Sequence, residues 1–544
     1  MSRTPLFRII NRVLSQAIQN ETSSSTALAF NRRDGACVGA VSALTLYLNA
    51  CKTPVSSDLQ GTSSGKKPSG DIVIVGGGAA GLSAAYYLQK AGVSSQVYEA
   101  TDRLGGRIYT QYQFNSENMF CERGGELVDT GHKEIQSLME ELGLKLQKLP
   151  DPTLPPEGHF FGGQWRSEED LVKGFGPLAA QIAKDAEGFM VDGQFTMPSY
   201  KNSLSDAILA LDKMSLKDYL DVNQSLAPKW VRELIRIAYL GEYGLDAEEQ
   251  SAVNLVSFIG TDIANGFKMF GESDELFRIE GGNSMLIQGL VGHVKNSCHL
   301  SHSLKSIARS ISGQFQLLFQ TADNKVLEVK TNTCILALPF TTVRDVQGID
   351  KIGLSPTKLK AIRELGYGTN SKLMLGFKKR YWRDGGSKFP SNDGNLVTDL
   401  PLQGGWDTSR KQAGESGIFT NFMGGSWAKT FTLAKAKGSL DDLEKIYPGI
   451  SKLYDSNRVL QVWTAVPTQK GSYICPKPGQ YTSMGGVFGE SECNGQLLFA
   501  GEHTSDVSAG FMNGAVESGL RVATALLEAK VKSASIDGLE REAI

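Results

Sequence analysis

Residues 71–100, with the sequence DIVIVGGGAAGLSAAYYLQKAGVSSQVYEA, decide the fold. The β-branched run at residues 72–75 has the composition of a buried parallel strand. Residues 79–90 follow with apolar side chains at helical spacing, and residues 96–98 form a second short strand. A strand, a helix and a strand in this order predict a βαβ unit at the start of an α/β domain.

Three glycines connect the first strand to the helix. Gly76, Gly78 and Gly81 form a G-x-G-x-x-G turn, and Glu99 ends the second strand 18 residues after Gly81. The first glycine makes the tight turn, the second lets the backbone approach a pyrophosphate, and the third packs the helix on the strand. Glu99 is placed to bind a ribose hydroxyl. A lone glycine motif is weak evidence, but one in register with two strands predicts an adenine dinucleotide site.

Composition sets wider limits. A chain of 544 residues, 41% of them hydrophobic, can bury a large core and form two or more lobes. The net charge of −2 gives no electrostatic indication of a nucleic-acid partner. The seven cysteines include no C-x-x-C pair, which argues against a disulfide framework or a zinc knuckle. Cys298, His299 and His302 lack a fourth ligand, so we predict no metal site.

Residues 1–51 have the features of an export leader. Arg32 and Arg33 precede an uncharged run at 36–50, which is short for a membrane span but suits a signal peptide. The paired arginines resemble a twin-arginine signal, and the run ends in a lipobox-like segment at Cys51, the cysteine that would carry the lipid. We therefore expect an exported, periplasmic or membrane-anchored lipoprotein, with residues 52–70 as a flexible tether. The alternatives are an N-terminal anchor helix, or a leader without function on a cytoplasmic protein.

Two further glycine motifs follow the first. They are R-L-G-G-R, ending at Arg107, and E-R-G-G-E, which contains Gly125 and Glu126. Here the sequence resembles the flavin-containing amine oxidase family, which includes monoamine, polyamine and L-amino-acid oxidases, and the resemblance extends over residues 71–527. It implies that the first motif wraps the diphosphate of FAD and that the second runs beneath the flavin. Arginine suits the first role because its fork pairs with phosphate; the alternative is a solvated turn.

The resemblance also implies a domain plan. A Rossmann-like FAD-binding domain of the glutathione-reductase-like type is interleaved with an α+β substrate-binding domain. The FAD-binding domain is expected at 71–135, 275–345 and 461–530, and the substrate domain at 136–274 (helical) and 346–460. Residues 531–544 are expected to be a tail that follows a last helix ending near residue 527.

Further cofactor contacts are implied by the resemblance alone. The backbone at Leu304 meets the adenine, and Trp463 lies in front of the flavin ring. Glu502 lies at the ribityl-diphosphate portion, and the amide of Met512 reaches a flavin carbonyl. Met512 opens a helix, whose N-terminus favours negative charge on the reduced ring. Some family members join a cysteine to the flavin at the position of Ser472, so we expect FAD to be bound non-covalently here.

Three residues carry the expected chemistry. Lys372 is one lysine in an apolar strand, and lysine is rarely buried without a reason. The resemblance implies that it holds a water against flavin N5 and assists the reaction with oxygen; the alternative is an exposed lysine on an edge strand. Tyr473 and Phe511 match the two walls of the family's aromatic cage, although phenylalanine departs from the usual tyrosine or tryptophan. The alternative for both is core packing.

The substrate is less defined. L-Amino-acid oxidases carry an arginine shortly after the second Gly-Gly, where this chain has none, although Arg232, Arg236 or Arg410 could serve instead. Polyamine oxidases often place an acid or histidine there, and Asp129 and His132 fall close to that position. This favours a mono- or polyamine, unless Asp129 caps the helix that starts near residue 133.

We therefore predict an FAD-dependent amine oxidase. A neutral amine gives a hydride to flavin N5, the imine is hydrolysed, and O2 reoxidises the flavin to give H2O2. The substrate is a mono- or polyamine or an L-amino acid. The alternatives are an L-amino-acid oxidase or tryptophan 2-monooxygenase-type enzyme, a desaturase or protoporphyrinogen-oxidase-like flavoprotein, and an FAD-binding interaction protein without turnover.

Overall fold

The computed structural model describes residues 72–155, 157–191, 194–202 and 205–542. The expected leader at 1–51 with its Cys51, and the tether at 52–70, lie outside the described residues. Within the described part, none of the helices has the length and apolarity needed to cross a membrane.

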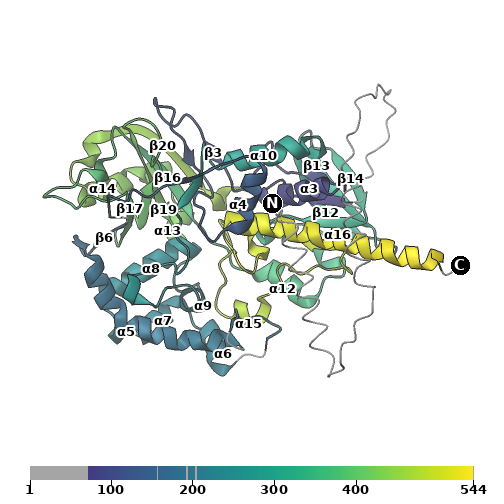
Figure 1. The fold of residues 1–544 in the computed structure, drawn as a ribbon, viewed down its shortest axis with the longest axis horizontal. Helices are drawn as coiled ribbons and strands as arrows, with labels where there is room; N and C mark the ends of the chain where they lie inside the picture. Colours follow the sequence, from purple (N-terminus) through teal and green to yellow (C-terminus); the bar gives the residue numbers. More distant parts are fainter. Residues whose placement is uncertain (1–71, 156, 192–193, 203–204, 543–544) are drawn as a thin grey trace, which may run out of the picture. The chain divides into compact units, whose positions relative to one another are not determined.

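The dinucleotide sheet is assembled from distant parts of the chain (Figure 1). Its five parallel strands lie in the order β11-β2-β1-β15-β21. Their bounds are β1 Ile72–Val75, β2 Gln96–Tyr98, β11 Cys298–His299, β15 Thr333–Leu336 and β21 Leu497–Phe499. These strands come from all three ranges expected for the FAD-binding domain. The α/β fold class is therefore confirmed, while the domain boundaries stay a prediction.

Helices cover this sheet. The first helix, α3 (Ala79–Lys90), lies against α10 (Ser284–Val294) and against α16 (Met512–Glu542), the long yellow helix of Figure 1. Leu82 and Val516 are fully buried in the core that α3 and α16 share. The last helix was expected to end near residue 527, but it continues to Glu542 and includes most of the expected tail.

A three-stranded antiparallel sheet lies beside the dinucleotide sheet. It consists of β12 His302–Arg309, β13 Phe315–Thr321 and β14 Val326–Thr331. Phe319 of β13 stacks on Tyr98 of β2 with ring centroids 4.5 Å apart, so the two sheets share an apolar contact. His299 stacks on Tyr98 as well, and its Nε2 lies 2.8 Å from Gln96 Oε1.

The second lobe is built on a seven-stranded mixed sheet in the order β20-β16-β19-β18-β17-β6-β7. The strands are β6 Glu157–Phe161, β7 Gln164–Arg166, β16 Ser371–Phe377, β17 Asn395–Thr398, β18 Gly404–Asp407, β19 Gly417–Met423 and β20 Tyr454–Val462. All pairs are antiparallel except β17 with β6. Because β16 lies between β20 and β19, Lys372 sits on an interior strand and not at an edge.

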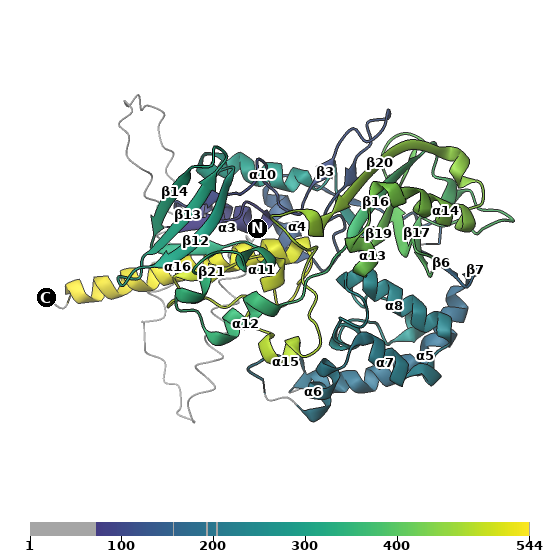
Figure 2. The same ribbon diagram turned by 180° about the vertical axis from the view of Figure 1, so that it is seen from behind.

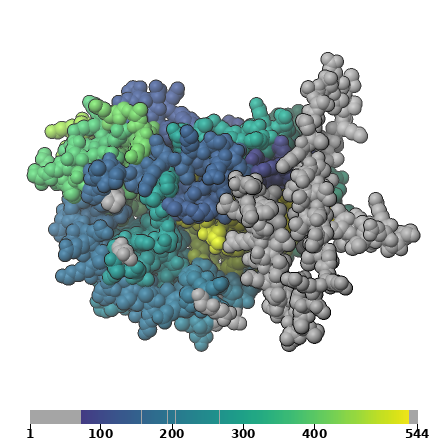
Figure 3. All heavy atoms as spheres, viewed as in Figure 1, coloured from purple at the N-terminus to yellow at the C-terminus, as the bar shows by residue number. Residues whose placement is uncertain are grey.

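Helices lie along one side of this sheet in both ribbon views (Figures 1 and 2). They are α5 Glu168–Ala186, α6 Asp206–Lys213, α7 Leu216–Val222, α8 Lys229–Tyr243 and α9 Val253–Val256. Ser167, Ser205 and Ser215 cap α5, α6 and α7, because each hydroxyl accepts a backbone N–H of the first turn. In the space-filling view, this blue helical surface adjoins the green surface of the sheet and of α14 (Ala436–Ile446) (Figure 3).

Residues 248–258 lie in the range expected to be helical, but only the four residues of α9 form a helix there. The side chain of Gln250 donates to the carbonyls of Tyr239 and Leu245, and the amide of Ser251 donates to Pro476 O. These tertiary bonds compete with helical ones and hold residues 248–251 in a turn.

The other elements are β3 Thr110–Gln111, β4 Cys121–Glu122, α4 Lys133–Glu141, β5 Leu146–Lys148, β8 Met190–Val191, β9 Gln194–Phe195, β10 Phe277–Ile279, α11 Phe340–Val343, α12 Pro356–Glu364, α13 Gly425–Lys429 and α15 Gln480–Met484.

Candidate active site

A cavity of about 1060 Å³ runs from the first glycine turn to the seven-stranded sheet. Most of the site residues predicted from the sequence line it. They are Gly76, Gly78, Glu99, Arg107, Gly125, Glu126, Lys372, Trp463, Tyr473, Glu502, Phe511 and Met512. Gly81 and Leu304 are not part of the lining: Gly81 packs α3 on β1, and Leu304 pairs with Phe319 in the three-stranded sheet. The adenine contact of the Leu304 backbone stays a prediction.

The glycine turn fits a pyrophosphate. Gly76 has a φ of +108°, which side chains rarely adopt, and a Cβ on Gly81 would lie 2.0 Å from Gly76 O. Backbone amides at the start of α3 border the cavity, as a helix N-terminus that holds phosphate requires. Glu99 Oε2 accepts the Gly77 amide at 2.8 Å, so its carboxylate is fixed at the end of β2 beside the turn.

An ion pair in the cavity lining joins the R-L-G-G-R motif to the segment that follows β21. Arg107 lies 2.8 Å from Glu502 Oε1 and also donates to Ser472 O. Glu502 Oε2 accepts the amide of Gly510 at 3.0 Å. A Cβ on Gly124 would lie 1.7 Å from Arg107 O, so only glycine allows the second motif to run this close to the first. The guanidinium and the amides around it suit a diphosphate, and the residues present therefore fit FAD.

Aromatic side chains form the wall beyond the cofactor motifs. Tyr473 donates its hydroxyl to Gly241 O at 2.9 Å, and burial raises its pKa well above 10. Phe511 rests against the His132 ring with centroids 5.0 Å apart. Trp463 donates its indole N–H to Arg123 O at 3.1 Å. The lining also includes aromatic residues that the sequence did not indicate: Tyr243, Phe258, Phe270, Trp406 and Phe422.

Lys372 is buried, with 5% of its surface exposed. Its Nζ donates to Gly124 O at 2.8 Å, to Glu126 Oε2 at 2.9 Å and to Glu122 O at 3.3 Å. An ammonium has three N–H donors, and here each has a protein acceptor. The predicted water between Lys372 and flavin N5 stays a prediction, and it requires the longest of these bonds to open.

Two carboxylates, Glu242 at the end of α8 and Glu275, line the substrate end of the cavity beside a third, Glu157, whose Oε2 lies 3.0 Å from His159 Nε2. Burial raises the pKa of Glu242 to about 8, and proximity to Glu275 adds to the shift. Burial and then Asp129 raise the pKa of Glu275 to about 7. Neither carboxylate has a hydrogen-bond donor or an ion-pair partner in the described part of the chain. No sequence motif marks either residue, because their meeting depends on how α8 packs against the loop before β10.

Asp129 is not placed to bind a substrate ammonium, and it does not cap α4. Its carboxylate accepts the Ser273 hydroxyl at 2.6 Å and the Glu275 amide at 3.0 Å, and Asp129 does not line the cavity. The cap position of α4 is His132, and no side chain caps that helix. Asp129 therefore supports the backbone of Glu275, and Glu275 takes the place at the cavity expected for Asp129.

The arginines considered for a substrate carboxylate lie elsewhere. Arg232 donates to Ala227 O, Arg236 pairs with Glu233, and Arg410 donates to Asp407 O. None of the three lines the cavity. Within the described residues, the cations that line it are Arg107 and Lys372, and each is paired with a carboxylate.

Comparison with known proteins agrees with this geometry. Residues 79–527 match the sequence model of the flavin containing amine oxidoreductase family. The L-amino-acid oxidase of Daboia russelii is 26% identical over 478 residues, covering 83% of this chain and 88% of that protein. The L-amino-acid oxidase of Siganus canaliculatus is 24% identical over 474 residues, covering 84% and 85%.

Solved structures share the fold. Putrescine oxidase with bound putrescine superimposes with a TM-score of 0.69 at 18% identity, covering 84% of this chain and 99% of that one. Cyclohexylamine oxidase from Brevibacterium oxydans IH-35A gives 0.70 at 19% identity, covering 85% and 99%. The family match spans most of the chain, and it confirms the family, the FAD cofactor and the oxidoreductase class predicted from the motifs. The chain therefore belongs to the flavin-containing amine oxidoreductase family, as an FAD-dependent amine oxidase.

Proposed function

We propose that this oxidase acts on an amine that carries a second positive charge, a diamine or polyamine. The observation that carries the proposal is the pair Glu242 and Glu275, two carboxylates that line the cavity and have no hydrogen-bond donor or ion-pair partner among the described residues. The absence of an unpaired arginine from the described lining argues in the same direction, since a substrate α-carboxylate would need one.

The electrostatics of the pair suit a cation. Burial raises the pKa of Glu242 to about 8 and that of Glu275 to about 7, and Glu275 adds to the shift of Glu242 because their negative charges would repel. An ammonium at about 4 Å gains on the order of 4 kcal/mol from one carboxylate at an effective dielectric constant of about 20. That gain outweighs the cost of releasing a proton near neutral pH, so the site ionises as the substrate binds.

The remaining residues position the reaction. Arg107 and the amides near Gly76 would hold the diphosphate, while Tyr473 and Phe511 border the space in which the reacting amine lies. FAD supplies the two-electron acceptor for a hydride from the carbon that bears the neutral nitrogen. The apolar walls exclude water during that transfer, and water hydrolyses the imine product afterwards. O2 then takes the two electrons and two protons and leaves as H2O2.

A peroxide assay on the purified yellow protein tests this function. We compare butane-1,4-diamine, butan-1-amine and a panel of L-amino acids. The proposal predicts that kcat/KM for the diamine exceeds that for the monoamine at least tenfold at pH 7.5. Equal values for the two amines would contradict it.

L-Amino-acid oxidation is the second candidate, supported by the names of the curated relatives, which are L-amino-acid oxidases. In this chain the substrate carboxylate would have to bind Lys372 after its bond to Glu126 opens. A 2-keto acid as product would identify this function. An amide with one oxygen atom from O2 would instead identify the monooxygenase outcome.

We also propose that residues 1–51 export the protein and that Cys51 carries a lipid. The support is the sequence alone: paired arginines, an uncharged run and a lipobox-like end. Export of a folded protein suits a flavoprotein, which can bind FAD before it crosses the membrane. Labelled palmitate should enter the wild type and not Cys51→Ser, and equal labelling of both would refute lipidation.

A further inference from the structure

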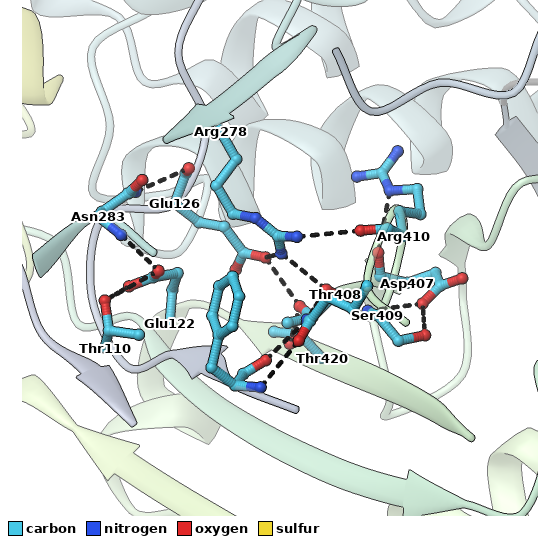
Figure 4. A network of polar contacts seen from close by, with 12 residues as sticks. Thr110, Glu122, Glu126, Arg278, Asn283, Asp407, Thr408, Ser409, Arg410 and Thr420 are labelled. Carbon is cyan, nitrogen blue, oxygen red and sulfur yellow. Dashed lines mark hydrogen bonds and ion pairs between the residues drawn. The ribbon is translucent and has the colours of Figure 1, made fainter. Parts of the chain in front are cut away.

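The ammonium of Lys372 belongs to a larger buried network. Glu126, with 2% of its side chain exposed, places Oε2 2.9 Å from Lys372 Nζ. Its Oε1 accepts the Thr408 hydroxyl at 2.8 Å and lies 3.9 Å from the Arg278 guanidinium. Figure 4 shows that the side chains of Glu126, Arg278 and Thr408 point toward one another. One carboxylate thus lies between two cations that reach it from different parts of the fold.

Other bonds fix the members of this network. Arg278 is fully buried and donates to Thr408 O at 2.7 Å and to Arg410 O at 3.0 Å. The side-chain amide of Asn283 donates to Gly125 O and Glu126 O, both at 2.9 Å, and so holds the backbone of the second glycine motif. The Glu126 carboxylate therefore has a fixed position, and Lys372 is oriented by it.

Glu126 is negatively charged in this setting. Burial alone would raise its pKa, but Lys372 and then Arg278 outweigh burial and lower it below the ordinary value. The other titratable groups that interact with Lys372 are Cys121, whose buried thiol is neutral, and Glu275 on the cavity wall. Glu126 is the carboxylate in direct contact with the Lys372 ammonium, and it is the counter-charge that this ammonium pairs with.

We infer that Glu126 is a positioning residue for the oxidative half-reaction, because it keeps the Lys372 ammonium charged and aimed at the flavin side of the cavity. The inference rests on the amine-oxidase assignment and not on the identity of the amine. In this half-reaction bound FAD, once reduced, would supply the two electrons that, with two protons, convert O2 to H2O2. Negative charge develops on oxygen in that transfer, and a fixed cation in a dry site stabilises it.

The test measures reoxidation alone. The holoenzyme and the variants Glu126→Gln, Lys372→Met and the double variant are photoreduced without oxygen and then mixed with O2 at pH values from 6 to 10. An opposite charge in contact favours the charged form of an ionisable group. We therefore expect reoxidation in Glu126→Gln to begin to slow at a lower pH than in the wild type. In Lys372→Met, reoxidation should be slow at every pH, and the double variant should match it.

Asp212→Asn serves as the matched control. Asp212 is a fully buried carboxylate on α6 that accepts the Ser251 and Thr482 hydroxyls and pairs with no cation of the described chain, so the pH profile of Asp212→Asn should equal that of the wild type. Thr408→Val keeps the charge of Glu126 but removes its hydrogen bond, and should give a smaller shift in the same direction. If Glu126→Gln does not bind FAD, Thr408→Val alone tests the inference. A wild-type pH profile in Glu126→Gln, a wild-type profile in Thr408→Val where Glu126→Gln holds no FAD, or a double variant slower than Lys372→Met would each overturn the inference.

The flavin midpoint potential gives a readout that is independent of turnover. If Glu126 keeps the lysine charged, loss of Glu126 at pH 6 leaves the lysine cation without its counter-charge. The reduced, anionic flavin is then stabilised, and the potential should rise. At pH 10 the variant loses the lysine charge as well, and the difference from the wild type should shrink. A shift of the same size at both pH values would contradict a role that acts through Lys372.

Discussion

Replacing Glu242 with glutamine removes a charge from the substrate end of the cavity and keeps the shape of the side chain. An ammonium at about 4 Å gains about 4 kcal/mol from this carboxylate at an effective dielectric constant of about 20. At pH 7 a carboxyl group with a pKa of about 8 must first lose its proton, which costs about 1.4 kcal/mol. The net loss is about 2.6 kcal/mol, or roughly 80-fold in kcat/KM for a diamine.

The assay compares two substrates of equal length at pH 7. Glu242→Gln should lower kcat/KM for butane-1,4-diamine by about 80-fold and change that for butan-1-amine less than about twofold, because the monoamine has no second charge. Because the pKa of Glu242 is raised, its charge is present above pH 8 and is lost as the pH falls through that value. The diamine-to-monoamine ratio of the wild type should therefore rise between pH 6 and 8, and Glu242→Gln should flatten the rise. An equal loss for both substrates would refute this reasoning.

Three further predictions concern FAD. Arg107→Met removes the cation beside Glu502 and should weaken FAD binding about 10- to 100-fold, as a lost charge-assisted hydrogen bond predicts; an unchanged Kd in a fluorescence titration would exclude Arg107 from the diphosphate site. Gly81→Ala puts a Cβ 2.0 Å from Gly76 O. The variant should therefore be purified without flavin, and its Tm should be at least several degrees lower than that of the wild type. A wild-type flavin content would contradict the turn described here. Acid precipitation should release all flavin from the chain, since Ser472 cannot form a thioether; a chain mass increased by flavin would show a covalent link.

The parts of the fold that depend on local sequence could be predicted. The first strand, glycine turn and helix follow from hydrophobic periodicity and backbone freedom over thirty residues, and the structure has them at the expected positions. Lys372 stood out because an isolated lysine in an apolar strand is rare, and it is buried on β16.

The substrate end of the cavity could not be predicted in the same way. Glu242 and Glu275 reach it from segments that meet only through tertiary packing, and neither lies in a recognisable motif. Asp129 is close to them in space but is turned toward Ser273 and the backbone of Glu275. The ion pair between Lys372 and Glu126 could not be predicted either. The glycine motif indicates that Glu126 is near the cofactor, but it does not indicate which side chain the Glu126 carboxylate contacts.

Anaerobic reduction of the bound flavin by a diamine is the decisive test of the proposed activity. The purified holoenzyme is mixed with butane-1,4-diamine in the absence of oxygen while the flavin absorbance is recorded. We expect the yellow colour to be lost and the admission of O2 to restore it, with one H2O2 formed for each flavin. A flavin that stays oxidised with every diamine, monoamine and L-amino acid tried, in protein that holds FAD at full occupancy, would contradict it.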